Sequence, residues 1–304
     1  MIFTSFCYII ISMIYVVMGP TCSGKTSAAN AIMDKLGCEA INFDAFQIYK
    51  EMNIGTSKLE QSDPHYPHYH LLDIVTPDTS FSVMEFQKRC RKELDDILKK
   101  NKDVVLVGGT GLYLRAVLYD YEFPVEDEKK DDSDLEQLDN QQLHKMLEEL
   151  DYEASTKIHQ NNRKRLIRAI SMIRNSDITK SERINAQKHE LVYPDVKFMF
   201  LSPDRDELYK NINERVIEMV NNGLVDEVKK LMKNYDLSLT AKQGIGYKEI
   251  MDFLRGNCSL DDAISLIQKR TRNYAKRQVT FFKNQFTYQL FTSKEELINS
   301  IEGE

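Results

Sequence analysis

The residues best suited to chemistry lie near the start of the chain, in a glycine-rich segment that ends in a lysine and a threonine. Gly19, Gly24, Lys25 and Thr26 occupy the fixed positions of the pattern G-x-x-x-x-G-K-T. In this pattern backbone N–H groups turn inward around a phosphate, a helix N-terminus adds partial positive charge, and the lysine adds a full charge. The threonine hydroxyl can ligate a magnesium ion carried by the phosphates. We therefore predict a polyphosphate site.

Polar residues also follow two other predicted strands. The strand over residues 39–43 ends at Asp44, and the strand over residues 103–107 runs into a second glycine-rich segment that contains Thr110. In an open α/β sheet, ligands gather at the carboxyl ends of the strands. We therefore expect Asp44 beside the phosphate loop, and the second glycine-rich segment as another wall of the same site. A simple tight turn is the alternative for that segment.

The second glycine-rich segment also lacks an expected group. P-loop enzymes that hydrolyse nucleotides usually place a magnesium-binding acid after the corresponding strand. Here Gly108 and Gly109 stand at that position. This disfavours an ATPase or a GTPase.

Arg215 is a cation in an apolar context. It falls inside the stripe of a predicted helix over residues 204–222. An arginine on the core-facing side of a helix needs an anion as partner. The partner is either an internal carboxylate or a bound phosphate. The stripe consists of Leu208, Ile212, Val216 and Met219.

Positive charge concentrates in two segments, although the formal net charge of the chain is −6. Residues 163–168 form the first basic patch, and residues 269–277 contain five basic residues together with Tyr274. Basic residues interleaved with an aromatic residue suit RNA phosphates and base stacking. A solvated helix face has a similar composition. We also predict a flexible loop over residues 243–248 that displays Tyr247 and Lys248.

The elements that position these residues indicate an α/β core with an insertion. A strand pattern at 14–18 and a helical pattern at 27–36 flank the phosphate loop. Only helical patterns fall between positions 120 and 190, at 140–150, 153–159 and 161–174. We therefore predict a P-loop NTPase-like core with a parallel sheet, formed by residues 1–119 and 193–304, and an inserted small all-helical subdomain over residues 120–192.

Two segments are expected to lie outside these elements. Residues 122–139 contain nine acidic residues and are predicted to be a mobile linker. Residues 1–12 are uncharged and apolar, and we interpret them as an extension or as the result of a mis-assigned start before Met13. They lack the basic residues of a signal peptide, and an anchor would consume the strand before the phosphate loop. We expect no membrane association.

Cysteine and histidine usage bears on metal sites and compartment. The five cysteines are scattered and show no C-x-x-C spacing, which excludes a disulfide framework and a zinc site and favours a reducing compartment, here the cytoplasm. His65, His68 and His70 could suggest a metal. Their loop setting and their lack of Cys or carboxylate partners in the sequence favour surface or scaffold roles.

Taken in order, the motifs resemble one family, the bacterial-type tRNA dimethylallyltransferases, also called tRNA isopentenyltransferases. The similarity covers most of the chain. Its motifs lie at residues 19–26, 44, 47–50, 54–56, 70–73, 108–113, 158–159, 165, 168, 246–248 and 272–278.

The resemblance implies a prenyl transfer to RNA. A dimethylallyl group would pass from dimethylallyl diphosphate to N6 of the adenosine 3′-adjacent to the tRNA anticodon. The P-loop would hold a diphosphate leaving group rather than ATP. The implied partner is the tRNA anticodon stem-loop, the implied cofactor is Mg²⁺, and no stable protein partner is implied.

The resemblance also assigns roles to residues of this sequence. Asp44 would accept the N6 proton, and Thr110 would hydrogen-bond the diphosphate or position the amine. The residues implied to bind the diphosphate are Gly19, Thr21, Cys22, Ser23, Gly24, Lys25, Thr26 and Arg215, with Thr26 also holding the magnesium through the diphosphate. The residues implied to bind tRNA are Asp44, Ala45, Phe46, Gln47, Lys164, Arg165, Arg168, Gln243, Gly246, Tyr247, Lys248, Arg272, Lys276 and Arg277.

The sequence departs from the family pattern at a few positions. Ala45 stands where the family usually has serine, Asn162 where it often has aspartate, and Gly244 where it often has alanine. None of these changes removes a catalytic group. The zinc-finger pattern of eukaryotic relatives is absent from the sequence, so a bacterial-type enzyme is expected.

Three other functions remain as alternatives. An isopentenyltransferase acting on free adenine nucleotides would share the P-loop and Asp44, but it should lack the basic insertion around residues 163–168. A nucleoside or nucleotide kinase would also use a P-loop, and the missing acid after Val107 disfavours it. An RNA-binding module without catalysis would leave Asp44 and the P-loop without a purpose.

Overall fold

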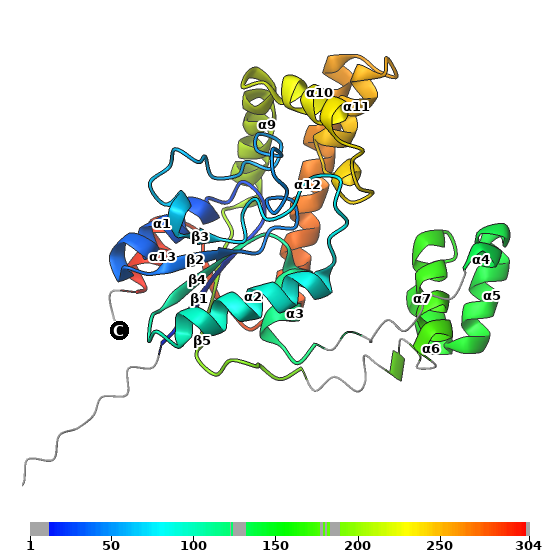
Figure 1. Cartoon of the computed structure of the whole chain (residues 1–304), viewed down its shortest axis with the longest axis horizontal. Coiled ribbons are helices and arrows are strands. Elements are labelled where there is room, and N and C mark those ends of the chain that lie inside the picture. The colour runs from blue at the N-terminus through cyan, green and yellow to red at the C-terminus, as the bar shows by residue number, and fades with distance from the viewer. Residues whose placement is uncertain are drawn as a thin grey trace, which may run out of the picture. The chain divides into compact units, whose positions relative to one another are not determined.

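The computed structural model describes residues 12–121, 123, 132–176, 179, 181–182 and 189–301 (Figure 1). Most of the predicted N-terminal extension and the residues of the acidic segment before position 132, except Phe123, lie outside this description. The chain divides into two compact units. The larger is formed by the residues up to Leu118 and from Tyr193 onward, and the smaller by Tyr119–Val192.

The larger unit is built on a parallel sheet whose described strands follow the order β3-β2-β4-β1-β5-β6. β1 lies in the middle, between β4 and β5, so the phosphate loop leaves the centre of the sheet. The strands predicted at 14–18, 39–43 and 103–107 are confirmed as β1, β2 and β4, with ends that differ by at most one residue. Their bounds are Ile14–Met18 for β1, Glu39–Asn42 for β2, Tyr69–His70 for β3, Val104–Gly108 for β4, Val196–Leu201 for β5 and Gln289–Phe291 for β6.

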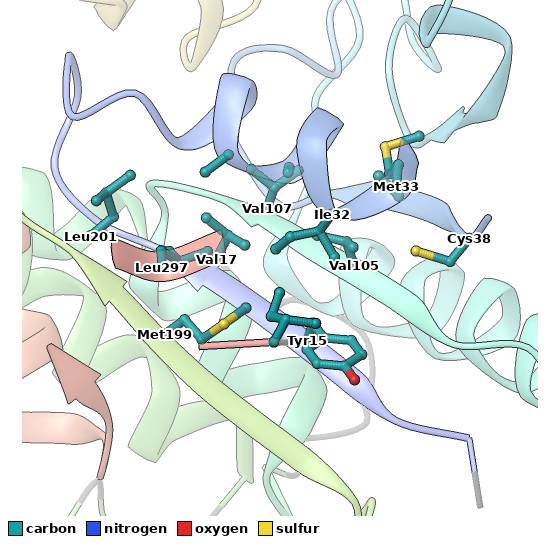
Figure 2. Packing of buried hydrophobic residues seen from close by; sticks show 14 of the residues in the cluster. Tyr15, Val17, Ile32, Met33, Cys38, Val105, Val107, Met199, Leu201 and Leu297 are labelled. Carbon is teal, nitrogen blue, oxygen red and sulfur yellow. The ribbon is translucent and has the colours of Figure 1, made fainter. Parts of the chain in front are cut away.

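One face of the sheet packs against α1 (Lys25–Leu36) and α13 (Lys294–Asn299). Because side chains alternate along a strand, every second residue of the central strands points to this face. Figure 2 shows the resulting core, in which side chains from β1, β4 and β5 meet Ile32 of α1 and Leu297 of α13. The sheet residues of this core include Tyr15, Val17, Val105, Val107, Met199 and Leu201.

The opposite face is covered by α2 (Val83–Leu98), α3 (Gly111–Leu118) and α12 (Leu260–Gln285). The intervening residues of β5 point to this side, where the Phe200 and Phe282 rings lie 5.8 Å apart between centroids. Burial on both faces explains why β1, β4 and most of β5 read as nearly continuous apolar runs. A capping box begins α2, since the Ser82 side chain accepts from the Glu85 N–H.

Three further helices lie beside α12 or one another: α9 (Arg205–Asn221), α10 (Leu224–Asn234) and α11 (Tyr247–Leu254). α9 is confirmed with Asp204 as its N-cap, whereas the sequence reading missed α10. The flexible loop predicted over residues 243–248 is wrong. A 3₁₀ turn at Ala241–Gln243 leads almost directly into α11, and Tyr247 is only 1% exposed. The positive φ of Gly246 makes this tight entry into the helix feasible.

The smaller unit is helical and has a hydrophobic core of its own. The predicted helices are present as α5 (Asn140–Leu150), α6 (Tyr152–Lys157) and α7 (Arg163–Ser176). The acidic linker expected to extend to residue 139 is wrong in its last part, because α4 (Ser133–Gln137) forms there and buries Leu135. The core consists of Leu135, Leu143, Leu147, Ala154, Ile158, Leu166, Ala169, Ile170 and Ile173.

Among the described residues, no helix combines the length and the hydropathy that a bilayer crossing requires.

Candidate active site

A cavity of about 850 Å³ opens in the larger unit, lined by residues from the loops after β1, β2 and β4 and from α9 and α12. Loops at the carboxyl ends of parallel strands are where α/β folds bind ligands. Gly108 and Gly109 line the same cavity as the phosphate loop, which confirms that both glycine-rich segments border one site. The predicted site residues in the lining are Thr21, Cys22, Gly24, Lys25, Thr26, Asp44, Phe46, Gln47, Arg215, Gln243, Tyr247 and Arg277.

Other predicted site residues lie outside this lining. In the larger unit they are Gly19, Ser23, Ala45, Thr110, Gly246, Lys248, Arg272 and Lys276. Lys164, Arg165 and Arg168 belong to the smaller unit. The predicted site residues therefore fall into three groups: those that line the cavity, those elsewhere in the larger unit, and those of the smaller unit.

The phosphate loop has the backbone geometry that its glycines predict. Cys22 and Gly24 have φ values of 62° and 84°, in the left-handed region, and Gly24 is the N-cap of α1. A Cβ atom on Gly19 would lie 2.2 Å from the Leu201 carbonyl oxygen, so only glycine fits there. The Ser23 Oγ atom is buried and has no hydrogen-bond partner within the described part of the chain. The loop thus wraps the N-terminus of α1, where the helix dipole favours an anion.

Lys25 and Arg215 face the cavity without a carboxylate partner among the described residues. Lys25 Nζ donates to the Pro20 carbonyl at 2.5 Å. Burial lowers the pKa of Lys25 to about 8, although the nearby Asp44 acts to raise it. Arg215 is half-buried on α9, with Nη1 3.8 Å from Cys22 Sγ. The internal carboxylate considered as a partner for Arg215 does not appear within the described part of the chain, so this cation is available to a ligand.

Asp44 is held by a turn after β2. Its Oδ1 atom accepts from the Phe46 N–H at 2.9 Å, and its own N–H donates to Asn42 Oδ1 at 3.0 Å. Thr110 Oγ1 accepts from the Ala45 N–H at 3.0 Å. Thr110 therefore supports the Asp44 turn from behind, instead of reaching into the cavity as a direct diphosphate ligand would. The result is a carboxylate with a fixed orientation.

The donor set suits a magnesium ion that is carried in by a diphosphate. No cluster of three or more His, Cys, Asp or Glu side chains able to hold a metal occurs among the described residues. Thr26 lines the cavity in the first turn of α1. Mg²⁺ typically keeps several waters and binds through phosphates with few protein ligands. The Thr26 hydroxyl fits that requirement.

Comparison with known proteins decides the family. A family model described as IPP transferase matches residues 47–285. The chain belongs to the IPP transferase family. Among its relatives, the tRNA dimethylallyltransferase of Anoxybacillus flavithermus is 39% identical, covering 94% of this chain and 92% of the relative. The enzyme of the same name from Acetivibrio thermocellus is 41% identical, covering 89% and 88%.

Solved structures agree with this assignment. The tRNA Δ(2)-isopentenylpyrophosphate transferase of Staphylococcus epidermidis superposes with a TM-score of 0.71 at 35% identity, covering 96% of this chain and 98% of that chain. A eukaryotic dimethylallyltransferase described as acting on tRNA gives a TM-score of 0.78 at 28% identity, covering 89% and 69%. The fold of this IPP transferase is therefore an α/β fold with a parallel sheet and a P-loop.

Sequence reasoning missed the residue that holds one wall of the cavity in this IPP transferase. The Glu227 carboxylate, on α10, accepts from the N–H groups of Asn53, Ile54 and Gly55 at 3.1, 2.8 and 3.2 Å. It also accepts from the Tyr247 hydroxyl at 2.7 Å. Tyr247 is thus an internal support of the 53–55 loop, not a displayed aromatic. No local pattern could have identified this carboxylate.

A buried lysine on the same wall was also missed. Lys58 donates to Asp73 Oδ1 at 2.6 Å and to Asn53 Oδ1 at 3.0 Å. Burial lowers the pKa of Lys58, and Asp73 opposes this effect. The motifs around residues 54–56 and 70–73 are joined by this ion pair.

His68 is exposed, and His65 and His70 act as supports, so the three histidines have the surface or scaffold roles expected; however, His65 and His70 do have carboxylate partners. His70 contacts Glu39 at 2.7 Å through Nε2 and Glu93 at 2.9 Å through Nδ1. His65 contacts Asp34 and Asp63 in the same way, at 2.9 Å each. Because each ring separates its two carboxylates, these groups do not converge on one metal position.

The basic residues divide into internal and exposed groups. Arg163 donates to the carbonyls of Leu135, Glu136 and Leu138, so it closes the end of α4. Arg272 donates to the Asn213 side chain. The exposed members of the two basic patches include Lys164, Arg165, Arg168, Lys276 and Arg277.

Proposed function

We propose that this IPP transferase transfers a dimethylallyl group from dimethylallyl diphosphate to N6 of the adenosine 3′-adjacent to the anticodon of tRNA. One observation carries the proposal. Lys25, Arg215 and Asp44 line one cavity. The two cations suit a leaving diphosphate, and the carboxylate suits an attacking amine. The names of the similar enzymes support the tRNA substrate.

The cationic part of the cavity stabilises the leaving group in this proposal. As the C–O bond between the dimethylallyl carbon and the diphosphate breaks, negative charge grows on the diphosphate oxygens. Lys25, Arg215 and the N-terminus of α1 are fixed positive groups that interact more strongly with that charge than with the intact ester. Mg²⁺, held by the diphosphate and the Thr26 hydroxyl, would neutralise part of the same charge.

Asp44 completes the reaction. The lone pair of the adenosine N6 forms the new C–N bond, the bonding pair of the C–O bond leaves with the diphosphate, and the excess proton on N6 passes to the Asp44 carboxylate. The hydrogen bond from the Phe46 N–H to Oδ1 fixes the orientation of this carboxylate. Thr110 acts by supporting the turn at Ala45.

The adenosine must leave its stack to enter the cavity, which costs a few kcal/mol. Contacts to the RNA backbone offset this cost. We assign these contacts to the exposed cations Lys164, Arg165 and Arg168 of the smaller unit and to Lys276 and Arg277 of α12. Around the cavity the proposed tRNA contacts are Phe46, Gln47 and Gln243, with Ala45, Gly246, Tyr247, Lys248 and Arg272 acting as supports or neighbours. The cytoplasm, where tRNA is abundant, is the proposed site of action.

The deciding experiment is mass analysis of nucleosides after incubation with dimethylallyl diphosphate and Mg²⁺. Three acceptors are compared: tRNA, an isolated anticodon stem-loop and AMP. N6-dimethylallyladenosine from the two RNAs but not from AMP is expected. Product from AMP alone would indicate a nucleotide prenyltransferase, and phosphate transfer from ATP without any prenyl product would indicate a kinase.

A further inference from the structure

Gln278 is a buried amide on α12 that none of the roles above uses. Only 5% of its surface is exposed. Burying an amide is unfavourable unless both its oxygen and its nitrogen are hydrogen-bonded. Tyr274 lies four residues earlier, on the same face of the helix, and its side chain lines the cavity.

Both ends of the Gln278 amide contact the backbone of cavity loops. Oε1 accepts from the Thr21 N–H of the phosphate loop at 2.9 Å. Nε2 donates to the Gly109 carbonyl of the second glycine-rich loop at 2.9 Å. A Cβ atom on Gly109 would lie 2.4 Å from Nε2, so the approach depends on glycine. One side chain thus joins the two loops.

Tyr274 continues this connection toward Asp44. Its hydroxyl lies close to the side chains of Thr110 and Gln278, and burial, followed by the Asp44 charge, raises its pKa. Thr110 in turn accepts from the Ala45 N–H, next to Asp44. The contacts therefore run without a break from the phosphate loop to the turn that carries the carboxylate.

We propose that Gln278 is a positioning residue that holds the diphosphate loop and the Asp44 turn at the separation that the transfer requires. This inference rests on the proposed function. The two ends of the reaction, diphosphate departure and proton removal, occur on different loops, and Gln278 is the side chain that is hydrogen-bonded to the backbones of both glycine-rich loops. A misplacement of reacting groups by about 1 Å can reduce a rate about 100-fold, which is why such a connection matters.

The first test is Gln278→Met, which keeps an unbranched side chain of similar size and removes both hydrogen bonds. We expect kcat to fall by about 10- to 100-fold, while KM for the diphosphate and the affinity for tRNA change by less than about threefold. Gln268→Met is the matched control. Gln268 lies in the same helix and donates to the Asn213 carbonyl at 3.1 Å, away from the cavity lining. It should leave kcat unchanged.

Gln278→Glu provides a readout that loss of stability does not mimic. The ionised carboxylate still accepts from the Thr21 N–H. Its second oxygen has no proton to donate, so it is repelled by the Gly109 carbonyl oxygen. The protonated acid restores a donor to Gly109. Burial raises the pKa of such a carboxyl group, so its protonation falls in a range accessible to assay. The ratio of its kcat to that of the wild type should therefore rise as the pH is lowered from about 8 to about 6.

The outcomes separate this inference from the proposed function. Wild-type protein that transfers no prenyl group would refute the function itself. An active wild type together with an unchanged kcat in Gln278→Met, or a pH-independent ratio in Gln278→Glu, would overturn the positioning role alone. A Gln278→Met variant that is unfolded at the assay temperature, judged by thermal unfolding, would assign Gln278 to stability and would also overturn it.

Discussion

Asp44 and the two cations Lys25 and Arg215 have opposite charges and line the same cavity, yet no ion pair joins them among the described residues. In a compact core, opposite charges would usually pair directly. Here the Asp44 carboxylate instead accepts from the Phe46 N–H, and Lys25 donates to the Pro20 carbonyl. The cations therefore remain available to an anionic substrate, and the carboxylate to the N–H group of a second substrate.

Replacing Asp44 by asparagine tests its role as the base. Asparagine keeps the oxygen that accepts from the Phe46 N–H, so the turn should persist. We expect kcat to fall by about two to four orders of magnitude, with tRNA affinity unchanged, as measured by single-turnover assays and filter binding. Asp63→Asn is the control, because Asp63 also lines the cavity but binds His65. An equal loss in both variants would argue for a general charge effect.

The pKa of Lys25 predicts how diphosphate binding depends on pH. Burial lowers this pKa to about 8, so the ammonium loses its proton above that pH in the free protein. A bound diphosphate favours the charged form and raises the pKa again. Binding therefore takes up a proton at high pH, and the affinity should fall by up to about tenfold per pH unit above about pH 8.

Titration of dimethylallyl diphosphate binding by calorimetry at several pH values measures this effect. Lys25→Met should bind weakly at every pH and should match the wild type at high pH. Cys22, Asp44 and Arg215 also face Lys25. Cys22→Ser removes the neighbouring thiol and should keep the pH dependence. Loss of the dependence in Cys22→Ser would assign the titration to the thiol.

At the scale of elements, α10 fixes a loop that lies far from it in the sequence. Glu227 is in the first turn of α10 and receives backbone N–H groups from residues 53–55 together with the Tyr247 hydroxyl. A Cβ atom on Gly55 would lie 2.5 Å from the Tyr247 ring, so the loop packs tightly on this support. One wall of the cavity therefore depends on a carboxylate that does not itself line the cavity.

Glu227→Gln should lower the stability of the protein. The amide keeps one acceptor oxygen but loses the charge and the second acceptor. We expect a loss of about 1–3 kcal/mol in the free energy of unfolding, measured by urea denaturation. Asp226→Asn removes the same charge from the same helical turn, where the side chain is exposed. That control should change stability by less than about 0.5 kcal/mol.

At the scale of the whole molecule, the chain forms two units, each with its own hydrophobic core. The larger unit contains the cavity, and the smaller unit presents exposed cations on α7. The formal net charge of −6 conceals this local patch, because the acidic residues lie elsewhere. Such a distribution is suited to a ligand that needs one anchor on its backbone and one pocket for a single base.

Removing the charges of Arg165 and Arg168 tests the role of the smaller unit. The double alanine variant should bind tRNA about 10- to 100-fold more weakly, and its plot of log affinity against log salt should be shallower by about two. Lys145→Ala, which removes an exposed cation from α5 of the same unit, is the control. Unaltered affinity in the double variant would exclude α7 from the RNA interface.

Local patterns in the sequence determined the phosphate loop, the strands β1, β2 and β4, the helix α9, and α5, α6 and α7 of the smaller unit. Alternation of apolar residues, helical stripes and capping residues act over a few positions, so they can be read directly. Local patterns did not predict the short elements that form where the backbone turns sharply. The 3₁₀ turn before α11 and the short helix α4 were not expected, because brief elements take their stability from tertiary contacts.

Only the tertiary structure decided which polar side chains are partners. The Thr21 N–H and the Gln278 side chain are 257 positions apart, and Glu227 is 172 positions from Gly55. Residue type alone does not distinguish Arg163 from Arg165. Arg163 donates to backbone carbonyl groups, whereas Arg165 is exposed. A sequence specifies the type of each group locally, whereas the free energy of burying that group depends on a partner that folding brings from elsewhere in the chain.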